Sequence, residues 1–240
     1  MPPGELLVEL LGVTKDYHAL RPLRLNRLEL HEGQSLALLG FDRALAEVLV
    51  NLITGAHLPD TGEVRVFGRA TSAIENASDW MSALDRFGLV SERAVLLDEL
   101  TAAQNVAMPL SLEITDMSDA LRARVHRLAD EVSLTAEELK APAGSLPPAA
   151  RLRIRLARAL ALDPKVMLAE HPNAAIPAEA APEFAADFAR VVERRRLGSI
   201  VLTADRTFAS AIADEVLTLE LATGALKAGL GWRRWFGNRT

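Results

Sequence analysis

The stretch Ser35-Leu-Ala-Leu-Leu-Gly40-Phe-Asp-Arg-Ala-Leu-Ala-Glu47-Val-Leu-Val-Asn-Leu-Ile53 decides the fold class. Its first six residues form an apolar run that ends in a glycine, which is typical of a buried strand followed by a turn. Residues 44–53 then predict a helix. A strand that leads directly into a helix is where a phosphate-binding loop would lie, but these residues alone contain no such motif.

The alternation of strands and helices continues along the chain. Short apolar or alternating runs predict further strands at residues 63–68, 87–91, 165–169, 199–204 and 216–220. Apolar side chains recur at helical spacing within 121–132 and 184–192. The region from about 100 to 162 is almost purely helical in pattern. We therefore expect one α/β domain over residues 1–230, a helical insertion at about 100–162 and a C-terminal tail at 231–240.

Composition limits the classes of function. The chain has 240 residues, 50% of them hydrophobic, and a formal net charge of −5, so no basic field attracts nucleic acid. It contains no cysteine, which excludes disulfides and thiolate chemistry. No apolar run reaches about 18 residues, the length that a membrane-spanning helix needs. These features predict a cytoplasmic protein without a nucleic-acid partner, and they are compatible with a place against a membrane.

Several stretches, in order, resemble the ATP-binding subunit of ABC transporters, and the likeness runs from Leu7 to about Leu226. They are Pro59-Asp-Thr-Gly-Glu-Val-Arg-Val-Phe-Gly68, Leu97-Asp-Glu-Leu-Thr-Ala-Ala-Gln-Asn-Val106, Leu156-Ala-Arg-Ala-Leu-Ala-Leu-Asp-Pro-Lys165 and Ala213-Asp-Glu-Val-Leu-Thr-Leu219. The resemblance implies an α/β fold, namely a P-loop cassette of the ABC type with a mixed sheet core and a helical insertion subdomain. It also implies ATP and Mg²⁺ as the family's usual ligands.

The phosphate loop that the resemblance implies is altered. Gly40 is kept, but Arg43 and Leu45 replace glycines. Ala46 replaces the family's lysine, and Glu47 replaces the hydroxyl that binds Mg²⁺. The site loses one positive charge and gains one negative charge, so phosphate binding in the usual pose should be lost or very weak.

Other family positions are altered too. By the resemblance, Glu92 stands in place of a glutamine that contacts Mg²⁺, Glu170 in place of the metal-side aspartate, and His171 in place of the catalytic glutamate. Asp205 is assigned to the position of a histidine that senses the γ-phosphate, and Tyr17 to that of the aromatic on which adenine stacks. Three of these residues have a structural alternative: Glu170 and His171 would form a solvated pair, and Tyr17 would pack on the N-terminal strands.

Two further segments bear on assembly. Where the family has Leu-Ser-Gly-Gly-Gln, its signature segment, this chain has Leu146, Pro147, Pro148, Ala149 and Ala150. Two prolines remove two N–H donors, so this segment should not complete the ATP site of a partner subunit. The tail contains the aromatic and basic residues Trp232, Arg233, Arg234, Trp235 and Phe236, which suit a membrane interface or a partner groove. The alternatives are that the tail packs back on the domain or is disordered.

The sequence thus favours a non-catalytic pseudo-ATPase cassette that acts as a scaffold or regulator in an ABC transporter-type complex. It would bind no cofactor and would lie on the inner face of the cell membrane. Its partners would be a transmembrane transporter subunit, a second cassette subunit or both, met through the helical insertion and residues 92–110. Two alternatives remain: an ATP-binding and hydrolysing subunit with an atypical site, which would use ATP and Mg²⁺, or a free-standing binding module.

Overall fold

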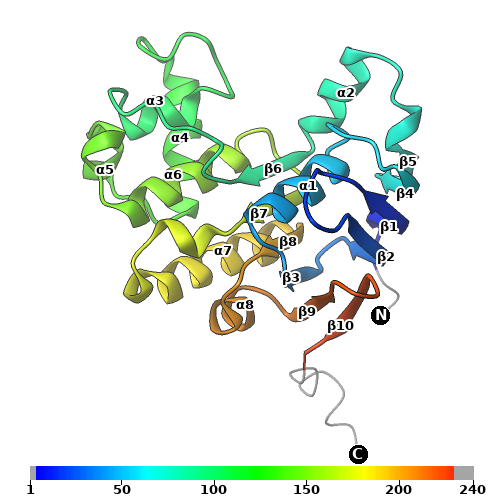
Figure 1. The fold of residues 1–240 in the computed structure, drawn as a ribbon. Coiled ribbons are helices and arrows are strands. Elements are labelled where there is room, and N and C mark those ends of the chain that lie inside the picture. Colours follow the sequence, from blue (N-terminus) through cyan, green and yellow to red (C-terminus); the bar gives the residue numbers. More distant parts are fainter. Residues whose placement is uncertain (1–3, 230–240) are drawn as a thin grey trace, which may run out of the picture.

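The computed structural model describes residues 4–229, and the tail predicted at 231–240 lies outside the described residues. Two sheets form the framework (Figure 1). The smaller sheet is antiparallel, with the strand order β2-β1-β4-β5. Its strands are β1 (Leu6–Lys15), β2 (Leu23–His31), β4 (Thr61–Val66) and β5 (Arg69–Ala70).

The larger sheet has the strand order β10-β9-β3-β8-β7-β6. All neighbouring pairs are parallel except β10 with β9, so the sheet is mixed, as predicted. Its strands are β3 (Ser35–Leu39), β6 (Phe87–Val90), β7 (Val166–Glu170), β8 (Gly198–Leu202), β9 (Glu215–Glu220) and β10 (Ala225–Ala228). The strand expected at 63–68 ends at Val66, because Phe67 and Gly68 adopt positive φ angles and form a turn.

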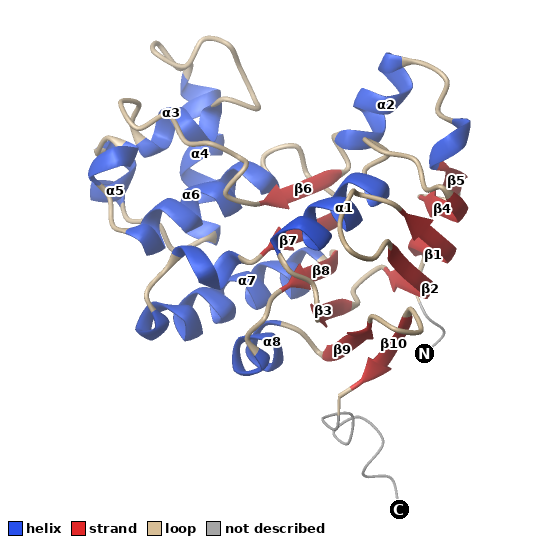
Figure 2. Cartoon of the chain, in the orientation of Figure 1, coloured by secondary structure: helices blue, strands red, loops and turns tan. Residues whose placement is uncertain are grey.

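Helices surround the two sheets (Figure 2). They are α1 (Arg43–Ile53), α2 (Ala77–Leu84), α3 (Ala102–Ala107), α4 (Asp119–Glu131), α5 (Ala136–Lys140), α6 (Pro148–Leu160), α7 (Ala181–Arg195) and α8 (Arg206–Ile212). In the described part of the chain, four short 3₁₀ helices lie at Thr71–Ala73, Ala143–Ser145, Pro172–Ala175 and Ala178–Ala180. The stretch between β6 and β7 contains α3, α4, α5 and α6. No helix within residues 4–229 is long and apolar enough to span a bilayer.

The core divides into two main clusters on the two faces of the larger sheet. Along β7, Val166 and Leu168 join one cluster and Met167 and Ala169 join the other, as the two-residue period of a strand requires. One cluster includes α1 and the smaller sheet, so that α1 lies between the two sheets (Figure 1). The other includes α3, α4, α6 and α7. Both faces of the sheet are therefore buried, and polar side chains gather where its strands end.

Candidate functional site

The candidate site lies at the edge where the parallel strands β3, β6, β7 and β8 end. Parallel α/β sheets bind ligands at the carboxyl ends of their strands. The register of the sheet aligns Leu38 of β3 and Glu170 of β7 with Leu202 of β8, and Val90 of β6 with Ala169. The predicted residues that directly follow these strands therefore share one edge.

The turn from β3 to α1 is short. Gly40 has a φ of +89°, and a Cβ there would approach the carbonyl oxygen of Leu219 to 3.1 Å, so only glycine fits this turn without strain. The helix begins at Arg43. The carboxylate of Asp42 accepts a hydrogen bond from the backbone N–H of Leu45 (2.8 Å), and the Asp42 carbonyl accepts one from the N–H of Ala46 (2.9 Å). Asp42 is thus an N-cap that neutralises its own helix start.

The first residues of α1 point in different directions. Ala46 is 1% exposed and packs in the core cluster between the sheets. Glu47 is exposed and faces the ends of the strands, where it meets Arg93. Position 46 is therefore a core position in this chain, with no room for a longer charged side chain unless neighbouring residues move.

Arg93 joins three elements at the site. Its Nε donates to Oε2 of Glu170 (3.0 Å), and its Nη2 donates to Oε1 of the same carboxylate, so the pair is bidentate. Its Nη1 donates to Glu47 (3.3 Å) and to Oδ1 of Asn51 (3.4 Å), both on α1. Ser91 Oγ also donates to Glu170 (2.6 Å). The hydrogen bonds to Glu170 raise the pKa of the Arg93 guanidinium, which stays positively charged.

A second arginine pairs with another of the predicted carboxylates, Glu92. Arg43 Nη1 donates to Oε2 of Glu92 (3.0 Å), and both side chains are largely exposed. Glu170 is different, because its side chain is only 9% exposed. The interpretation of Glu170 and His171 as a solvated pair is therefore wrong for Glu170, whose oxygens are bound by Arg93 and Ser91 instead of water.

His171 and Asp205 have local structural roles. His171 adopts a left-handed conformation (φ 45°), its N–H donates to the carbonyl of Leu202 (2.8 Å), and its Nε2 is buried without a hydrogen-bond partner among the described residues. The carboxylate of Asp205 caps α8 by accepting hydrogen bonds from the N–H groups of Thr207 (2.8 Å) and Phe208 (3.0 Å). This cap explains a carboxylate at position 205 without a nucleotide.

Comparison with known proteins shows the family to which the chain belongs. The family model described as ABC transporter matches residues 23–174, well over half of the chain. The chain belongs to the ABC transporter family.

Two curated relatives are ATP-binding proteins of importers. Sulfate/thiosulfate import ATP-binding protein CysA of Pseudomonas aeruginosa is 30% identical over 216 residues, which is 88% of this chain and 63% of that protein. Methionine import ATP-binding protein MetN of Rhizobium etli is 26% identical over 217 residues, 90% of this chain and 59% of that protein. The chain thus spans less than two thirds of the length of these relatives.

Solved structures show the same fold. The ATP-binding cassette MJ0796, in a dimeric post-hydrolysis state bound to ADP and Pi, matches with a TM-score of 0.76 at 23% identity, over 93% of this chain and 98% of that one. The chain cbiO1 from Clostridium perfringens, part of the ABC transporter complex cbiONQ, matches with a TM-score of 0.79 at 17% identity, over 93% and 87%. The predicted ABC cassette fold is therefore confirmed.

The other predicted site residues of this ABC cassette lie apart from the Arg93 contacts. Tyr17 packs against the core cluster of β1 and β2, and its pKa is raised by burial and by the charge of Asp42. The segment 146–150 leads into α6, which has the exposed Pro147 as its N-cap and Pro148 as its first residue. No side chain caps this helix start. Trp232, Arg233, Arg234, Trp235 and Phe236 lie outside the described residues.

Asp42 and Arg93 were not predicted from the sequence as members of the site of this cassette, and Arg43 was predicted only as the replacement of a loop glycine, not as the partner of Glu92. A signal for Arg93 was present: four acidic residues, Glu47, Glu92, Glu170 and Asp205, were assigned to the family's site positions, and such a cluster needs cations nearby. Arg93 follows Glu92 directly in the sequence. An aspartate immediately before an apolar helical pattern is also a usual N-cap signal.

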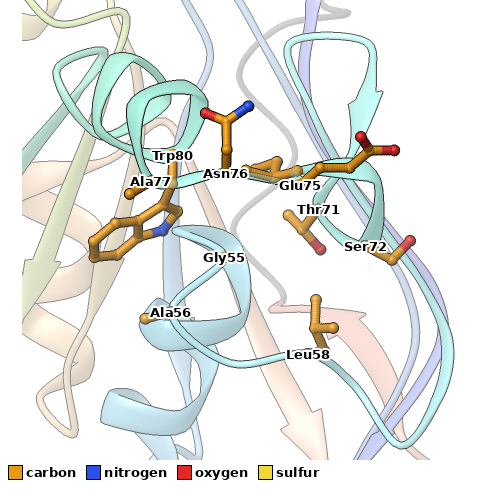
Figure 3. Close-up of a pocket in the computed structure, with 10 residues that line it drawn as sticks. Gly55, Ala56, Leu58, Thr71, Ser72, Glu75, Asn76, Ala77 and Trp80 are labelled. Carbon is orange, nitrogen blue, oxygen red and sulfur yellow. The ribbon is translucent and has the colours of Figure 1, made fainter.

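A hollow of about 380 Å³ lies at the other end of α1 (Figure 3). Gly55, Leu58, Thr71 and Asn76 are among the residues that line it, and Trp80 borders it while its indole N–H donates to the carbonyl of Thr54 (3.1 Å). Because α1 separates this hollow from the Asp42 end by about 16 Å, the two are distinct features of the surface.

Proposed function

We propose that this cassette is a non-catalytic subunit that acts as a scaffold or regulator in an ABC transporter-type complex. The observation that carries the proposal is the start of α1 at Arg43 with Asp42 as its cap. In a phosphate loop of the pattern G-x-x-x-x-G-K-[ST], backbone N–H groups cradle the phosphates. With Gly40 as the first glycine, residues 43–46 of such a loop are already helical here.

A nucleotide triphosphate does not fit these residues. The N–H groups of Leu45 and Ala46 are bound within the chain. The carboxylate of Asp42 occupies the electrostatically favourable position at the helix N-terminus that a phosphate would need, and two anions at one helix start repel each other. Micromolar binding requires about 8 kcal/mol of net free energy, which a site without a free N–H cradle or lysine does not supply.

A divalent metal does not fit either. The carboxylates of Glu47 and Glu170 are bound by the guanidinium of Arg93, and Glu92 is bound by Arg43. No group of three or more acidic, histidine or cysteine side chains within residues 4–229 could hold a metal ion. The residues therefore support the expectation that the chain needs neither ATP nor Mg²⁺.

The start of α6 supports the same proposal for a partner's site. Pro147 and Pro148 supply no N–H donors, and neither has a side chain that could bind a phosphate. A subunit paired with this one would have to bind any nucleotide without help from this segment.

Exposed apolar side chains support a protein partner. Among the described residues, Val95 is 66% exposed and Leu97 45% exposed in the predicted contact region 92–110, and Leu112 is fully exposed just beyond it. All three belong to the stretch between β6 and α4, and exposed apolar patches often mark interfaces. Together with the names of the import relatives, they support a transmembrane transporter subunit, a second cassette subunit or both as partners, and a position on the inner face of the membrane.

A second candidate is favoured by those same names. The curated relatives are called import ATP-binding proteins, so this chain would be a nucleotide-binding subunit with an atypical site. In that case α1 would have to rearrange at its first turn to free the N–H groups of Leu45 and Ala46.

Calorimetric titration of the purified chain with Mg²⁺-ATP, together with an ATPase assay, tests the proposal. We expect no binding at millimolar nucleotide and no turnover above a denatured control. The variant Ala46→Lys with Glu47→Ser restores the family side chains, yet we expect it to bind no better because α1 still begins at Arg43 and position 46 is buried. Turnover by the wild type that disappears on His171→Ala would establish the second candidate instead.

A further inference from the structure

We infer that the guanidinium of Arg93 takes the place of a bound metal ion at this site. The guanidinium holds together α1, β7 and the loop after β6. The inference rests on the proposed function, because it explains how the edge of the sheet is held without a ligand. It also has a consequence of its own: removal of the guanidinium should convert the site into one that binds a divalent cation.

The contacts of Arg93 are those of a bound ion. Both oxygens of Glu170, one oxygen of Glu47 and the amide oxygen of Asn51 converge on its guanidinium. Ser91 contributes a hydroxyl next to the same carboxylate. Oxygen atoms of carboxylates, amides and hydroxyls are also the ligands that Ca²⁺ and Mg²⁺ prefer. In the wild-type chain these oxygens bind the Arg93 guanidinium instead of a metal ion.

The elements that Arg93 joins are far apart in sequence. Glu47 is 46 residues before Arg93, and Glu170 is 77 residues after it. Glu170 is nearly buried, with a side chain only 9% exposed, whereas Arg93 is 38% exposed and closes the site from outside. A side chain fixed in this way holds the three elements permanently, whereas a dissociable ligand would hold them only while bound.

Loss of the guanidinium leaves two carboxylates facing one vacated position. Glu170 would keep only Ser91 as a hydrogen-bond donor, and Glu47 would have no cation next to it at this edge. Carboxylates that share a site repel each other and attract any available cation. A divalent ion in solution would then restore what the arginine supplied.

Thermal unfolding of Arg93→Gln, measured in EDTA and again with 5 mM Mg²⁺ or Ca²⁺, tests the inference. We expect the melting temperature in EDTA to fall by about 5 °C and to rise again by several degrees with at least one of the ions. Arg43→Gln is the matched control, because it removes an arginine from the same edge that pairs with an exposed carboxylate. The wild type and this control should change by less than about 1 °C with either ion.

Two outcomes would overturn the inference: an Arg93→Gln chain that melts like the wild type, or one whose loss of stability neither ion restores. If Arg93→Gln does not fold, Arg93→Lys keeps the charge but not the bidentate pair, and it should melt below the wild type without responding to the ions. Wild-type melting of Arg93→Lys would also overturn the inference. No nucleotide is used, so this inference and the proposed function can each fail alone.

Discussion

Two arginines, Arg93 and Arg153, have similar partners in different parts of the molecule. Arg153 of α6 donates through Nε to Asp187 of α7 (2.9 Å) and through Nη2 to Glu183 (2.7 Å). Asp187 also accepts hydrogen bonds from Arg190 (2.7 Å) and Ser133 (3.0 Å). The Arg153 side chain is 10% exposed, against 38% for Arg93.

The difference in location and exposure indicates different roles. The Arg153 pair supports the packing of two helices, whereas Arg93 takes the place of a ligand, as inferred above. The Arg153 contacts join α6 to α7 and hold these two helices against each other. Burial lowers the pKa of Arg153, but the hydrogen bond and charge of Asp187 outweigh this effect, and the pKa is raised overall. Arg93 forms the same kind of ion pair at the edge of the sheet, where the candidate site lies. Location and burial, not residue type, therefore decide what each arginine does.

The largest effect should come from breaking the buried pair. Asp187→Ala leaves Arg153 buried with only an exposed carboxylate as its partner, so we expect a loss of about 3 kcal/mol or more in the free energy of unfolding. Urea denaturation measures this loss. Glu183→Ala is the control: its carboxylate is 72% exposed, and its removal should cost less than about 1 kcal/mol. Equal losses in the two variants would mean that burial of the carboxylate does not determine how much each pair contributes to the free energy of unfolding.

Salt should distinguish the two arginines next. Double-mutant cycles for Arg93 with Glu47 and for Arg153 with Asp187 give the coupling energy of each pair. Because Arg93 and Glu47 are partly exposed, we expect their coupling, of about 1 kcal/mol at low salt, to decrease at 1 M NaCl, where charges are screened within roughly 3 Å. The buried pair should keep most of its coupling. A salt response of the same size in both cycles would contradict the comparison.

The cap of α1 should give a smaller effect at the site itself. Asp42→Ala removes the acceptor of the Leu45 N–H, and we expect a loss of about 1 kcal/mol in the free energy of unfolding. Asn76→Ala, the corresponding change at the cap of α2, is the control, because α2 has no buried residues and should fray locally with little effect on global unfolding. An Asp42→Ala chain as stable as the wild type would show that the cap does not hold the first turn.

The framework could be predicted from the sequence because apolar periodicity decides it. The buried strand Ser35–Leu39 and the helix Arg43–Ile53 follow from their patterns, and so do β7 and β8, whose side chains are buried on both faces of the sheet. Strands at the N-terminus were expected, but no residue ranges were predicted for β1 and β2. In β2, Leu23 and Leu25 alternate with polar residues, but the period shifts by one before Leu28, which weakens the two-residue pattern.

The interior of the site could be predicted only in part. The sequence placed Glu47 and Glu170 at strand and helix ends, but it could not show that one guanidinium binds both, because that contact depends on how α1 and β7 pack. The burial of Ala46 depends in the same way on the second sheet. Helix caps can be predicted from the sequence because they depend on a few neighbouring residues. Ion pairs between distant segments cannot, because they depend on tertiary packing.

The smallest effect should come from the exposed ion pair between Asp60 and Lys15. The carboxylate of Asp60 accepts hydrogen bonds from the backbone N–H of Asp16 (2.6 Å) and from Lys15 (2.7 Å), and these lower its pKa from the usual 3.8. A group with a lowered pKa in the folded state stabilises the protein above its unfolded pKa, and this contribution is lost as the pH falls through the folded value. Asp60→Asn should therefore lower the melting temperature slightly at pH 6, and the difference from the wild type should shrink as the pH falls below 3.8 and through the lowered pKa of the folded state. Lys15→Gln leaves the backbone N–H of Asp16, which is the largest single cause of the lowered pKa, so it should give a smaller difference at pH 6. A difference between Asp60→Asn and the wild type that grows toward low pH would mean that the neutral carboxyl is the favoured form, opposite to the direction that these two donors impose.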